Sequence, residues 1–177
     1  EIEFFSLGQA VAYFKAMYFG DASAAAEILL ADNPRICRSI DCRIGRSDDV
    51  GWVEVLRKVL WLCTKERTLQ NPRQVAALVL TQGRPITFCV ANELLWGAGV
   101  LPGESVLGQV DRLPGKNWFG KALTHVRDTL LEPLFPLADG SADRPASNRE
   151  RAVLLALTLY YLDKAAGIWG RKFKVGD

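Results

Sequence analysis

The sequence has few of the residues from which catalytic and metal centres are most often built. Its 177 residues include one histidine, His125, and no closely spaced cysteine pairs. A structural zinc site needs such pairs together with further Cys or His ligands, so no metal site is expected. The cysteines are expected to be reduced and mostly buried, as in a cytosolic protein. They are Cys37, Cys42, Cys63 and Cys89.

Several well-known motifs are also absent. The sequence lacks a G-x-G-x-x-G, a P-loop, an H-E-x-x-H and a G-x-S-x-G, so it gives no signal for a bound dinucleotide, NTP or zinc cofactor, and none is assigned. Neither sign of charge is in excess, because 22 basic residues face 20 acidic ones for a net charge of +2. A dedicated nucleic-acid binder usually shows a marked basic excess, so nucleic acid is not an expected partner.

Long hydrophobic runs and a start methionine are missing as well. The longest apolar stretch, residues 152–162, contains one threonine and is shorter than the ~20 residues that span a bilayer, so it is expected to pack inside the protein. No signal peptide can be read, and a cytoplasmic location is expected. The chain begins at Glu1 and its one methionine is Met17. We therefore expect it to be a processed or excised part of a longer product.

The residues that are present describe one soluble globular domain. Hydrophobic residues make up 49% of the chain and charged residues 24%, with 15 glycines and 8 prolines, which excludes disordered and collagen-like classes. Apolar spacing and capping residues predict a mostly helical α+β fold. Helices are expected at 6–19, 21–30, 48–64, 71–83, 117–131 and 149–166, a strand at 85–90, a mixed-charge loop at 35–46, a functional loop at 96–116, a Pro/Gly/Ser-containing linker at 133–147 and a solvated basic tail at 171–174.

Three segments attract attention when they are taken together. The first expected helix carries Ser6-Leu7-Gly8-Gln9 and then Lys15-Ala16, the expected strand leads into Glu93-Leu94-Leu95-Trp96-Gly97-Ala98-Gly99, and a later helix starts at Gly115-Lys116-Asn117-Trp118-Phe119-Gly120. This order resembles the NADAR superfamily, the NAD- and ADP-ribose-associated domains that include YbiA-like proteins. The resemblance covers roughly residues 4–131. The matching residues are Gln9, Lys15, Ala16, Trp52, Lys65, Gln70, Asn71, Trp96, Gly97, Gly99, Gly115, Asn117, Gly120, Leu123 and Arg127.

The resemblance implies a compact NADAR-like domain with a small sheet at 1–132, followed by the linker and by an added C-terminal helix with its basic tail at 148–177. It also implies a pocket for an ADP-ribose-type nucleotide and, in active members, hydrolysis of an N-glycosidic bond, including removal of ADP-ribose from modified guanine. Lys15 and Glu93 would be the catalytic residues. The ligand would be bound by Gln9, Trp96, Gly97, Asn117 and Arg127.

The departures from the family pattern concern its carboxylates. Glutamates of the family align with Gly8 and Phe88, and an aspartate aligns with Glu93. The loss of one general acid or base typically costs about 10²–10⁴-fold in rate. We therefore expect a degenerate site, with Lys15 reaching solvent for want of acidic partners, in a structural or interaction module of a larger protein. Family analogy suggests a viral, capsid-associated setting with protein partners.

Other functions stay open at this point. The main alternative is an active N-glycosidase that uses Lys15 and Glu93 on ADP-ribose-type nucleotides or ADP-ribosylated guanine. A third hypothesis is a nucleotide sensor that binds without cleaving. A nucleic-acid role for the basic end is the least favoured, and it would require salt-dependent binding.

Overall fold

The computed structural model describes residues 2–45, 49–81, 83–104, 110–131 and 173–175. In this part of the chain it contains six α-helices and one two-stranded antiparallel sheet, which confirms the expected mostly helical α+β class. The chain divides into two compact units. One unit comprises Glu1–Arg67 together with Gly170–Asp177, and the other comprises Thr68–Trp169.

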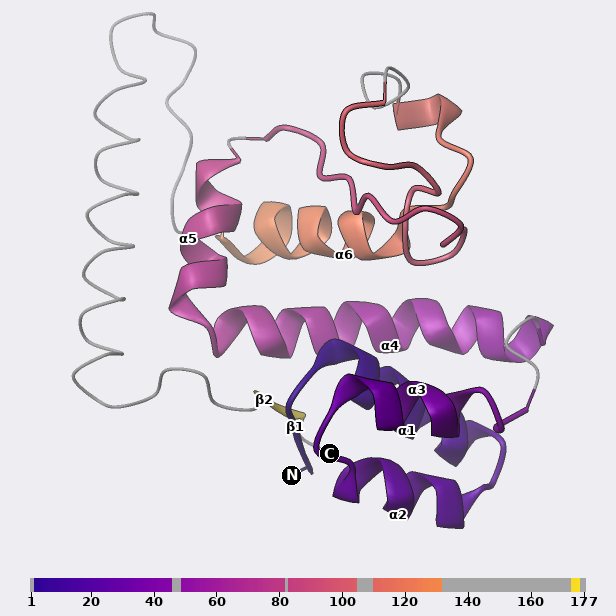
Figure 1. Cartoon of the computed structure of the whole chain (residues 1–177). Helices are drawn as coiled ribbons and strands as arrows, with labels where there is room; N and C mark the ends of the chain where they lie inside the picture. The colour runs from indigo at the N-terminus through magenta and orange to yellow at the C-terminus, as the bar shows by residue number, and fades with distance from the viewer. Residues whose placement is uncertain (1, 46–48, 82, 105–109, 132–172, 176–177) are drawn as a thin grey trace, which may run out of the picture. The chain divides into compact units, whose positions relative to one another are not determined.

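The first unit combines the small sheet with the N-terminal helices (Figure 1). Each of its first three helices begins at a residue whose side-chain oxygen accepts backbone N–H groups of the first turn: Ser6, Asp21 and Asn33. The helices expected at 6–19 and 21–30 are thereby confirmed. The elements are β1 (Ile2–Phe4), α1 (Leu7–Tyr18), α2 (Ala22–Leu30), α3 (Pro34–Asp41), most of α4 (Val50–Leu69) and β2 (Phe173–Val175).

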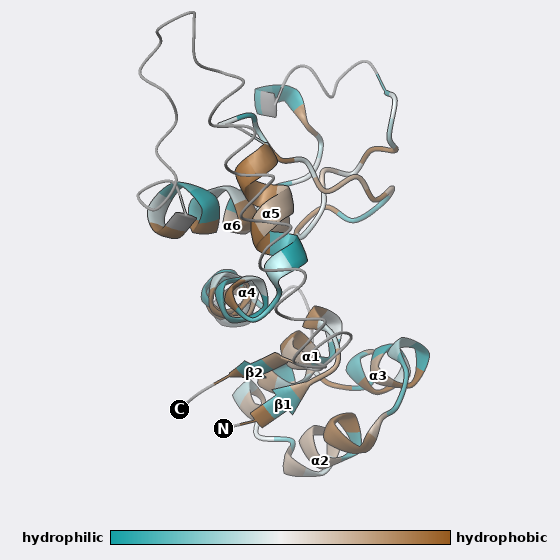
Figure 2. Ribbon diagram, turned by 90° about the vertical axis from the view of Figure 1, so that its left-hand side faces the viewer, coloured by the Kyte–Doolittle hydropathy of each residue, from teal (hydrophilic) through white to brown (hydrophobic). Residues whose placement is uncertain are grey.

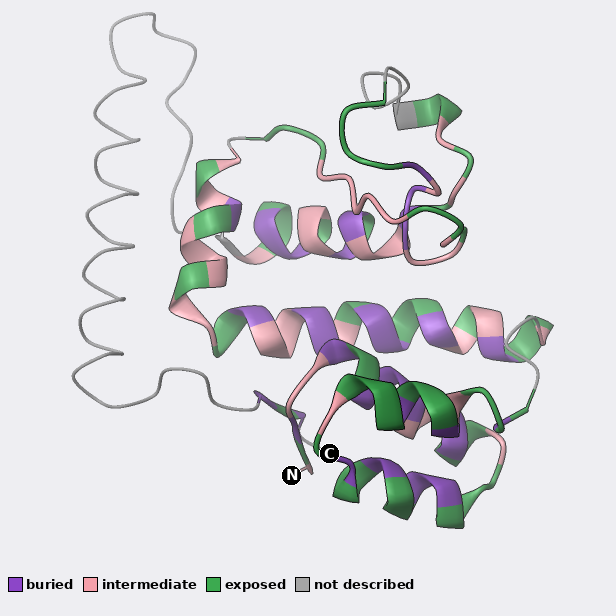
Figure 3. Ribbon diagram, in the orientation of Figure 1, coloured by how far each residue is buried: buried purple, intermediate pink, exposed green. Residues whose placement is uncertain are grey.

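Helix α3 corrects the prediction of a loop at 35–46. Asn33 caps this helix and Pro34 occupies its first turn, where a missing N–H group costs nothing. Pro34 therefore starts α3 and does not mark the beginning of a loop. On α3 the side chains of Cys37 and Ile40 are buried, while its remaining surface is largely hydrophilic and exposed (Figures 2 and 3).

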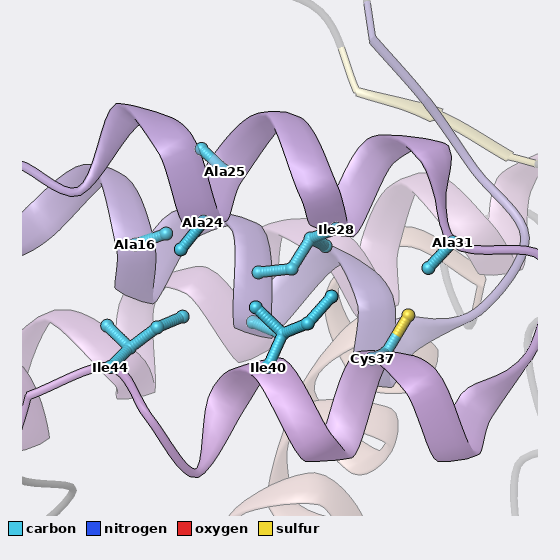
Figure 4. Close-up of a cluster of buried hydrophobic side chains, with 9 residues drawn as sticks. Ala16, Ala24, Ala25, Ile28, Ala31, Cys37, Ile40 and Ile44 are labelled. Atoms are coloured by element: carbon cyan, nitrogen blue, oxygen red, sulfur yellow. The ribbon is translucent and has the colours of Figure 1, made fainter.

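Helices α1, α2 and α3 share a core of small and branched side chains (Figure 4). Alanines supply the contacts of α1 and most of those of α2, and isoleucines together with one cysteine fill the space next to α3. Small side chains at a contact allow helix axes to approach closely. The buried members are Ala12, Ala16, Ala24, Ala25, Ile28, Ala31, Cys37, Ile40 and Ile44.

Helix α4 is longer than the expected 48–64. At its start the Oδ1 of Asp49 accepts the N–H of Trp52, at 2.8 Å. The helix then continues to Leu69. Leu56 and Leu60 are buried along it (Figure 3), as expected for a helix with an apolar stripe.

The two strands come from opposite ends of the chain and pair in antiparallel register. Phe4 lies opposite Phe173, Glu3 opposite Lys174 and Ile2 opposite Val175. Phe173 and Val175 are 4% and 3% exposed. The expected solvated tail is therefore wrong at these positions, because alternate side chains of the strand are buried against the first unit.

The second unit is organised around helices α5 (Pro72–Leu80) and α6 (Trp118–Val126). The Asn71 cap confirms the start of the helix expected at 71–83, but the helix ends at Leu80, before Gly83 with its φ of 73°. A short 3₁₀ turn, η2 (Val110–Arg112), lies in the long loop, and α6 continues into a π turn, η3 (Arg127–Leu131). Leu78 and Val126 are buried at the centre, surrounded by Val75, Val79, Ile86, Leu123 and Leu130.

The strand expected at 85–90 is wrong. Residues 84–90 form no sheet ladder, and a single parallel bridge joins Ala91 to Gly99. The backbone of this segment is bonded instead to a side chain, that of Asn117, and to the N–H of Ala98. β-branched residues favour a strand only where a neighbouring strand supplies the partners.

Several predictions lie outside the described residues. These are the linker at 133–147 and the helix expected at 149–166, so the boundary at residue 132 stays a prediction. None of the helices within the described ranges is long and apolar enough to cross a membrane.

Candidate functional site

Lys15, the first predicted catalytic residue, is buried and ion-paired. It is 2% exposed on α1, and its Nζ donates to the carbonyl oxygen of Asp41 at 3.0 Å and lies 3.2 Å from Asp41 Oδ1. Asp41 is the last residue of α3, where the helix dipole also favours a cation. The expectation that Lys15 reaches solvent is therefore wrong. Sequence reasoning missed Asp41 because the segment was taken as a loop.

Gln9 lies one and a half turns before Lys15 on α1 and joins three elements. Its Oε1 accepts the N–H of Phe5 at 2.8 Å, and its Nε2 donates to the carbonyl oxygens of Ile28 at 2.8 Å and Ala31 at 3.4 Å. The side chain is buried, with 3% of Gln9 exposed. Both ends of the amide thus hold the start of α1 against the end of α2, which is a positioning role within the fold.

Gly8, which the sequence resemblance aligns with a family glutamate, has room for a side chain. It is exposed, and the nearest heavy atom to a Cβ placed there would be Ser6 Oγ, at 3.9 Å. The absence of a carboxylate here is therefore not enforced by crowding. Gly8 is also a helical glycine with an ordinary backbone, so a larger residue would be tolerated.

Glu93, the second predicted catalytic residue, belongs to the second unit and caps its own turn. Its Oε1 accepts the N–H groups of Leu95 and Trp96, each at 3.2 Å. A carboxylate that accepts two backbone N–H groups is committed to local structure. Trp96, a predicted ligand-binding residue, is half-buried at the end of this turn.

The Asn117 side chain bonds to the backbone of residues 86–88, as a neighbouring strand would. The residue is 2% exposed and adopts the left-handed conformation, with φ 51° and ψ 41°, which asparagine tolerates better than most residues. Its Oδ1 accepts the N–H of Phe88 at 2.9 Å, and its Nδ2 donates to the carbonyl oxygen of Ile86 at 2.8 Å. A Cβ on Gly120 would overlap Ile86 O and the Asn117 amide. The Asn-x-x-Gly spacing therefore brings α6 against the segment.

The start of α6 is closed by backbone contacts. Gly97 O accepts the N–H of Asn117 at 2.9 Å, and the N–H groups of Trp118 and Phe119 donate to the carbonyl oxygens of Leu95 and Trp96 at 3.1 and 3.0 Å. A Cβ on Gly115 would overlap Gly97 O, so the absence of a side chain at Gly115 permits the close approach. Free N–H groups at a helix start often bind phosphate, but here these are already used.

Phe88, which the sequence resemblance aligns with the other family glutamate, packs against an aromatic ring. Its ring centroid is 5.0 Å from that of Phe119, with the planes at 90°. This edge-to-face geometry is a favourable arrangement for two aromatic rings. The position thus contributes apolar packing where a carboxylate would supply charge.

Arg127, the last predicted ligand-binding residue, is 3% exposed and bonded on several sides. Its Nη1 donates to Thr81 Oγ1 at 2.7 Å and to Arg84 O at 2.6 Å, and its Nε donates to Asp128 Oδ1 at 2.7 Å. The guanidinium group fixes the connection after α5 to the end of α6. This explains its burial, since a buried charge must be paired and hydrogen-bonded.

Ionisable groups elsewhere in the first unit have raised pKa values, Cys63 and Tyr18 among them. Burial, with a smaller effect of the Glu66 charge, raises the pKa of the Cys63 thiol to about 12. Desolvation, reinforced by the charge and hydrogen bond of Asp49, raises the pKa of Tyr18. Both groups are therefore neutral at physiological pH and available as packing residues rather than as nucleophiles.

Comparison with known proteins assigns the family. A NADAR domain profile matches residues 1–131, the greater part of the chain. The chain belongs to the NADAR family.

Two curated relatives of this NADAR domain are distant. It is 24% identical over 120 residues to Protein irg-1 of Caenorhabditis elegans, covering 67% of this chain and 57% of irg-1. It is 23% identical over 126 residues to N-glycosidase R617 of Acanthamoeba polyphaga mimivirus, covering 71% of this chain and 74% of R617. The match thus spans little more than half of irg-1, and one relative is named for N-glycosidase activity.

The predicted site residues of this NADAR domain fall into two sets, one in each unit. Gln9 and Lys15 lie in the first, and the remaining candidates, Glu93, Trp96, Gly97, Asn117 and Arg127, lie in the second. In both sets the polar side chains are bonded to residues of their own unit. The parts of the chain that the structure describes contain no cluster of His, Cys, Asp or Glu suited to a metal ion.

Proposed function

We propose that this chain is a NADAR domain that has kept the fold of an N-glycosidase ancestor but not its catalysis, and that it serves as a structural or interaction module. One observation carries the proposal: the Lys15 ammonium is buried against Asp41, while the two positions of the family glutamates hold Gly8 and Phe88. The lysine is thus neutralised within its own unit.

The chemistry explains why these changes matter. When an N-glycosidic bond breaks, positive charge develops on the ribose carbon, and a carboxylate must stabilise that charge or activate water. Neither Gly8 nor Phe88 can do so. Glu93 retains a carboxylate, but its Oε1 is held by the two backbone N–H groups of its turn. The loss of one such group typically lowers the rate about 10²–10⁴-fold, and the loss of both would lower it further.

The polar groups expected to bind an ADP-ribose-type ligand support the same proposal. The amides of Gln9 and Asn117 and the guanidinium of Arg127 each make at least two hydrogen bonds inside the protein. A ligand would have to replace these bonds, and breaking a buried hydrogen bond costs about 1–3 kcal/mol. Trp96, which is half-buried, is the residue best able to stack on a nucleotide base.

The second candidate function is an active N-glycosidase, and the Asp41 carboxylate is the observation that favours it. Asp41 Oδ1 lies 3.2 Å from Lys15 Nζ and its side chain is 35% exposed. A carboxylate beside a lysine, open to solvent on one side, could replace one of the missing groups. Lys15 and Asp41 would then act on ADP-ribose-type nucleotides or ADP-ribosylated guanine.

Restoring the carboxylates distinguishes the two functions. The chain and its G8E/F88E variant are incubated with ADP-ribosylated guanosine, and release of ADP-ribose is followed by chromatography. We expect no release by the natural chain. Release by G8E/F88E, but not by the isosteric neutral control G8Q/F88Q, would show that the missing carboxylates are what the site lacks. Release by the natural chain that is abolished by Lys15→Ala would instead establish the active enzyme.

Calorimetry with ADP-ribose separates a third outcome. Binding without cleavage would identify a nucleotide sensor, and the absence of both would leave the structural or interaction role. Within that role we propose protein partners in a larger, cytoplasmic assembly. The corresponding test is to express the chain together with any sequences that flank it in its natural reading frame, and to identify the proteins that co-purify.

A further inference from the structure

The NADAR match ends at residue 131, yet the first unit contains a strand from much farther along the chain. Strand β2 (Phe173–Val175) is part of the same compact unit as residues 1–67. It pairs with β1 in antiparallel register (Figure 1). The unit is therefore completed by residues that the family profile does not include.

Phe173 of β2 packs against Phe4, and Phe4 contacts α1, the helix that carries Gln9 and Lys15. Phe173 is 5.9 Å, ring centroid to centroid, from Phe4, and Phe4 is fully buried. Phe4 in turn lies 5.5 Å from Tyr13 and 6.1 Å from Phe14, both on α1. Aromatic contacts of this kind are favourable beyond the area they bury. The sheet is thus connected to α1 by a continuous aromatic cluster.

A hydrogen bond makes the same connection at the start of α1. The N–H of Phe5, directly after β1, donates to Gln9 Oε1, and Gln9 Nε2 holds the end of α2. The position of β1 therefore determines whether Gln9 can make its bonds. Lys15 lies farther along this helix and holds the end of α3.

We propose that β2 is a detachable strap whose docking on β1 orders helix α1, and with it Gln9 and Lys15. A two-stranded sheet of three residues per strand is marginal in water, so the strap depends on Phe173 and Val175 remaining in place. β2 follows the second unit in the sequence, and it is held on β1 by the ladder and by the contact of Phe173 with Phe4. Its release loosens α1 while the second unit stays folded. The proposal does not depend on whether the site is catalytic.

Hydrogen exchange of the full chain tests the strap. Phe173→Ala is expected to raise the exchange of α1 amides about ten-fold or more, without a matching change in α5 and α6, because local opening is governed by local contacts. Lys174→Ala is the matched control, since Lys174 is exposed on the same strand. Addition of a peptide of residues 170–177 restores protection, whereas the same peptide with alanine for Phe173 does not.

A disulfide staple provides the opposite perturbation. Glu3 and Lys174 are exposed and lie directly opposite each other in the ladder, so the E3C/K174C variant can form a disulfide there. A C42S background removes the exposed natural thiol, which would otherwise compete in the oxidation. Oxidation is expected to slow exchange in α1 below that of the natural chain, and reduction is expected to reverse it. Unchanged α1 exchange in the stapled form, or equal changes in α1, α5 and α6 for Phe173→Ala, would overturn the proposal.

Discussion

Replacing Asp41 by asparagine tests the electrostatic role assigned to the Lys15 pair. Lys15 has a side chain that is 3% exposed, whereas that of Asp41 is 35% exposed. Asp41→Asn removes the carboxylate that lies 3.2 Å from the buried ammonium group and keeps the carbonyl oxygen that accepts from it. Breaking a fully buried pair in this way costs about 3–5 kcal/mol. The partial exposure of the carboxylate reduces this, and we expect a loss of about 1–3 kcal/mol in the free energy of unfolding.

Replacing the other member of the pair, Lys15, is expected to lower the free energy of unfolding by a smaller amount. Lys15→Met fills a similar volume and removes the charge, while the Asp41 carboxylate can turn toward water. Urea denaturation followed by circular dichroism measures both variants, and each kcal/mol corresponds to about 2–4 °C in Tm for a chain of this size. The control is Glu27→Gln, which breaks the exposed Glu27–Arg43 pair and is expected to cost no more than about 0.5 kcal/mol. A cost for Asp41→Asn equal to that of this control, or smaller than that of Lys15→Met, would refute the reasoning.

Three further predictions concern other parts of the chain. Asn117→Ala removes both hydrogen bonds to the segment at 86–88 and a residue that tolerates the left-handed conformation, so it should lower the free energy of unfolding by about 2–4 kcal/mol in urea denaturation. Asn117→Gly keeps the backbone conformation and should cost less. Equal costs would show that the conformation is unimportant. Gly120→Ala should lower Tm strongly because its Cβ would overlap a carbonyl oxygen, while Gly8→Ala should be neutral or stabilising. In thiol titration at pH 8, Cys42, which is exposed, should react before unfolding, and Cys63, with its pKa raised to about 12, should react only in denaturant; rapid reaction of Cys63 would contradict its burial.

The helix starts could largely be predicted from the sequence because capping is local. Ser6, Asp21 and Asn71 each lie within three residues of the N–H groups that they cap. Asn33 carries the same signal, followed by Pro34, but a proline after an apolar segment also fits a helix end. Local sequence alone did not distinguish the two.

Sheet structure could not be predicted in the same way because it depends on distant partners. The segment around Phe88 has strand composition, but its backbone partner is the side chain of Asn117. The actual strands are three residues each and pair Ile2 with Val175. Nothing in a window of either strand indicates the other.

The candidate site was predicted as a set of residues, and the structure adds what each residue contacts. The match of Asn117, Gly120 and Gly97 to the family pattern indicated a ligand pocket, whereas their observed contacts are with the backbone of the same unit. A pattern of residue types does not distinguish a ligand from a backbone segment as hydrogen-bond partner. Asp41 could be found only once α3 was placed against α1.

The measurement that tests the central claim most directly is a single-turnover assay, with the natural chain in large excess over ADP-ribosylated guanosine. If the site has lost its catalytic carboxylates, no ADP-ribose is released above the rate without protein, and G8E/F88E releases it. Release by the natural chain that disappears in both Lys15→Ala and Asp41→Asn would contradict the claim, because the pair at the centre of the first unit would then be catalytic.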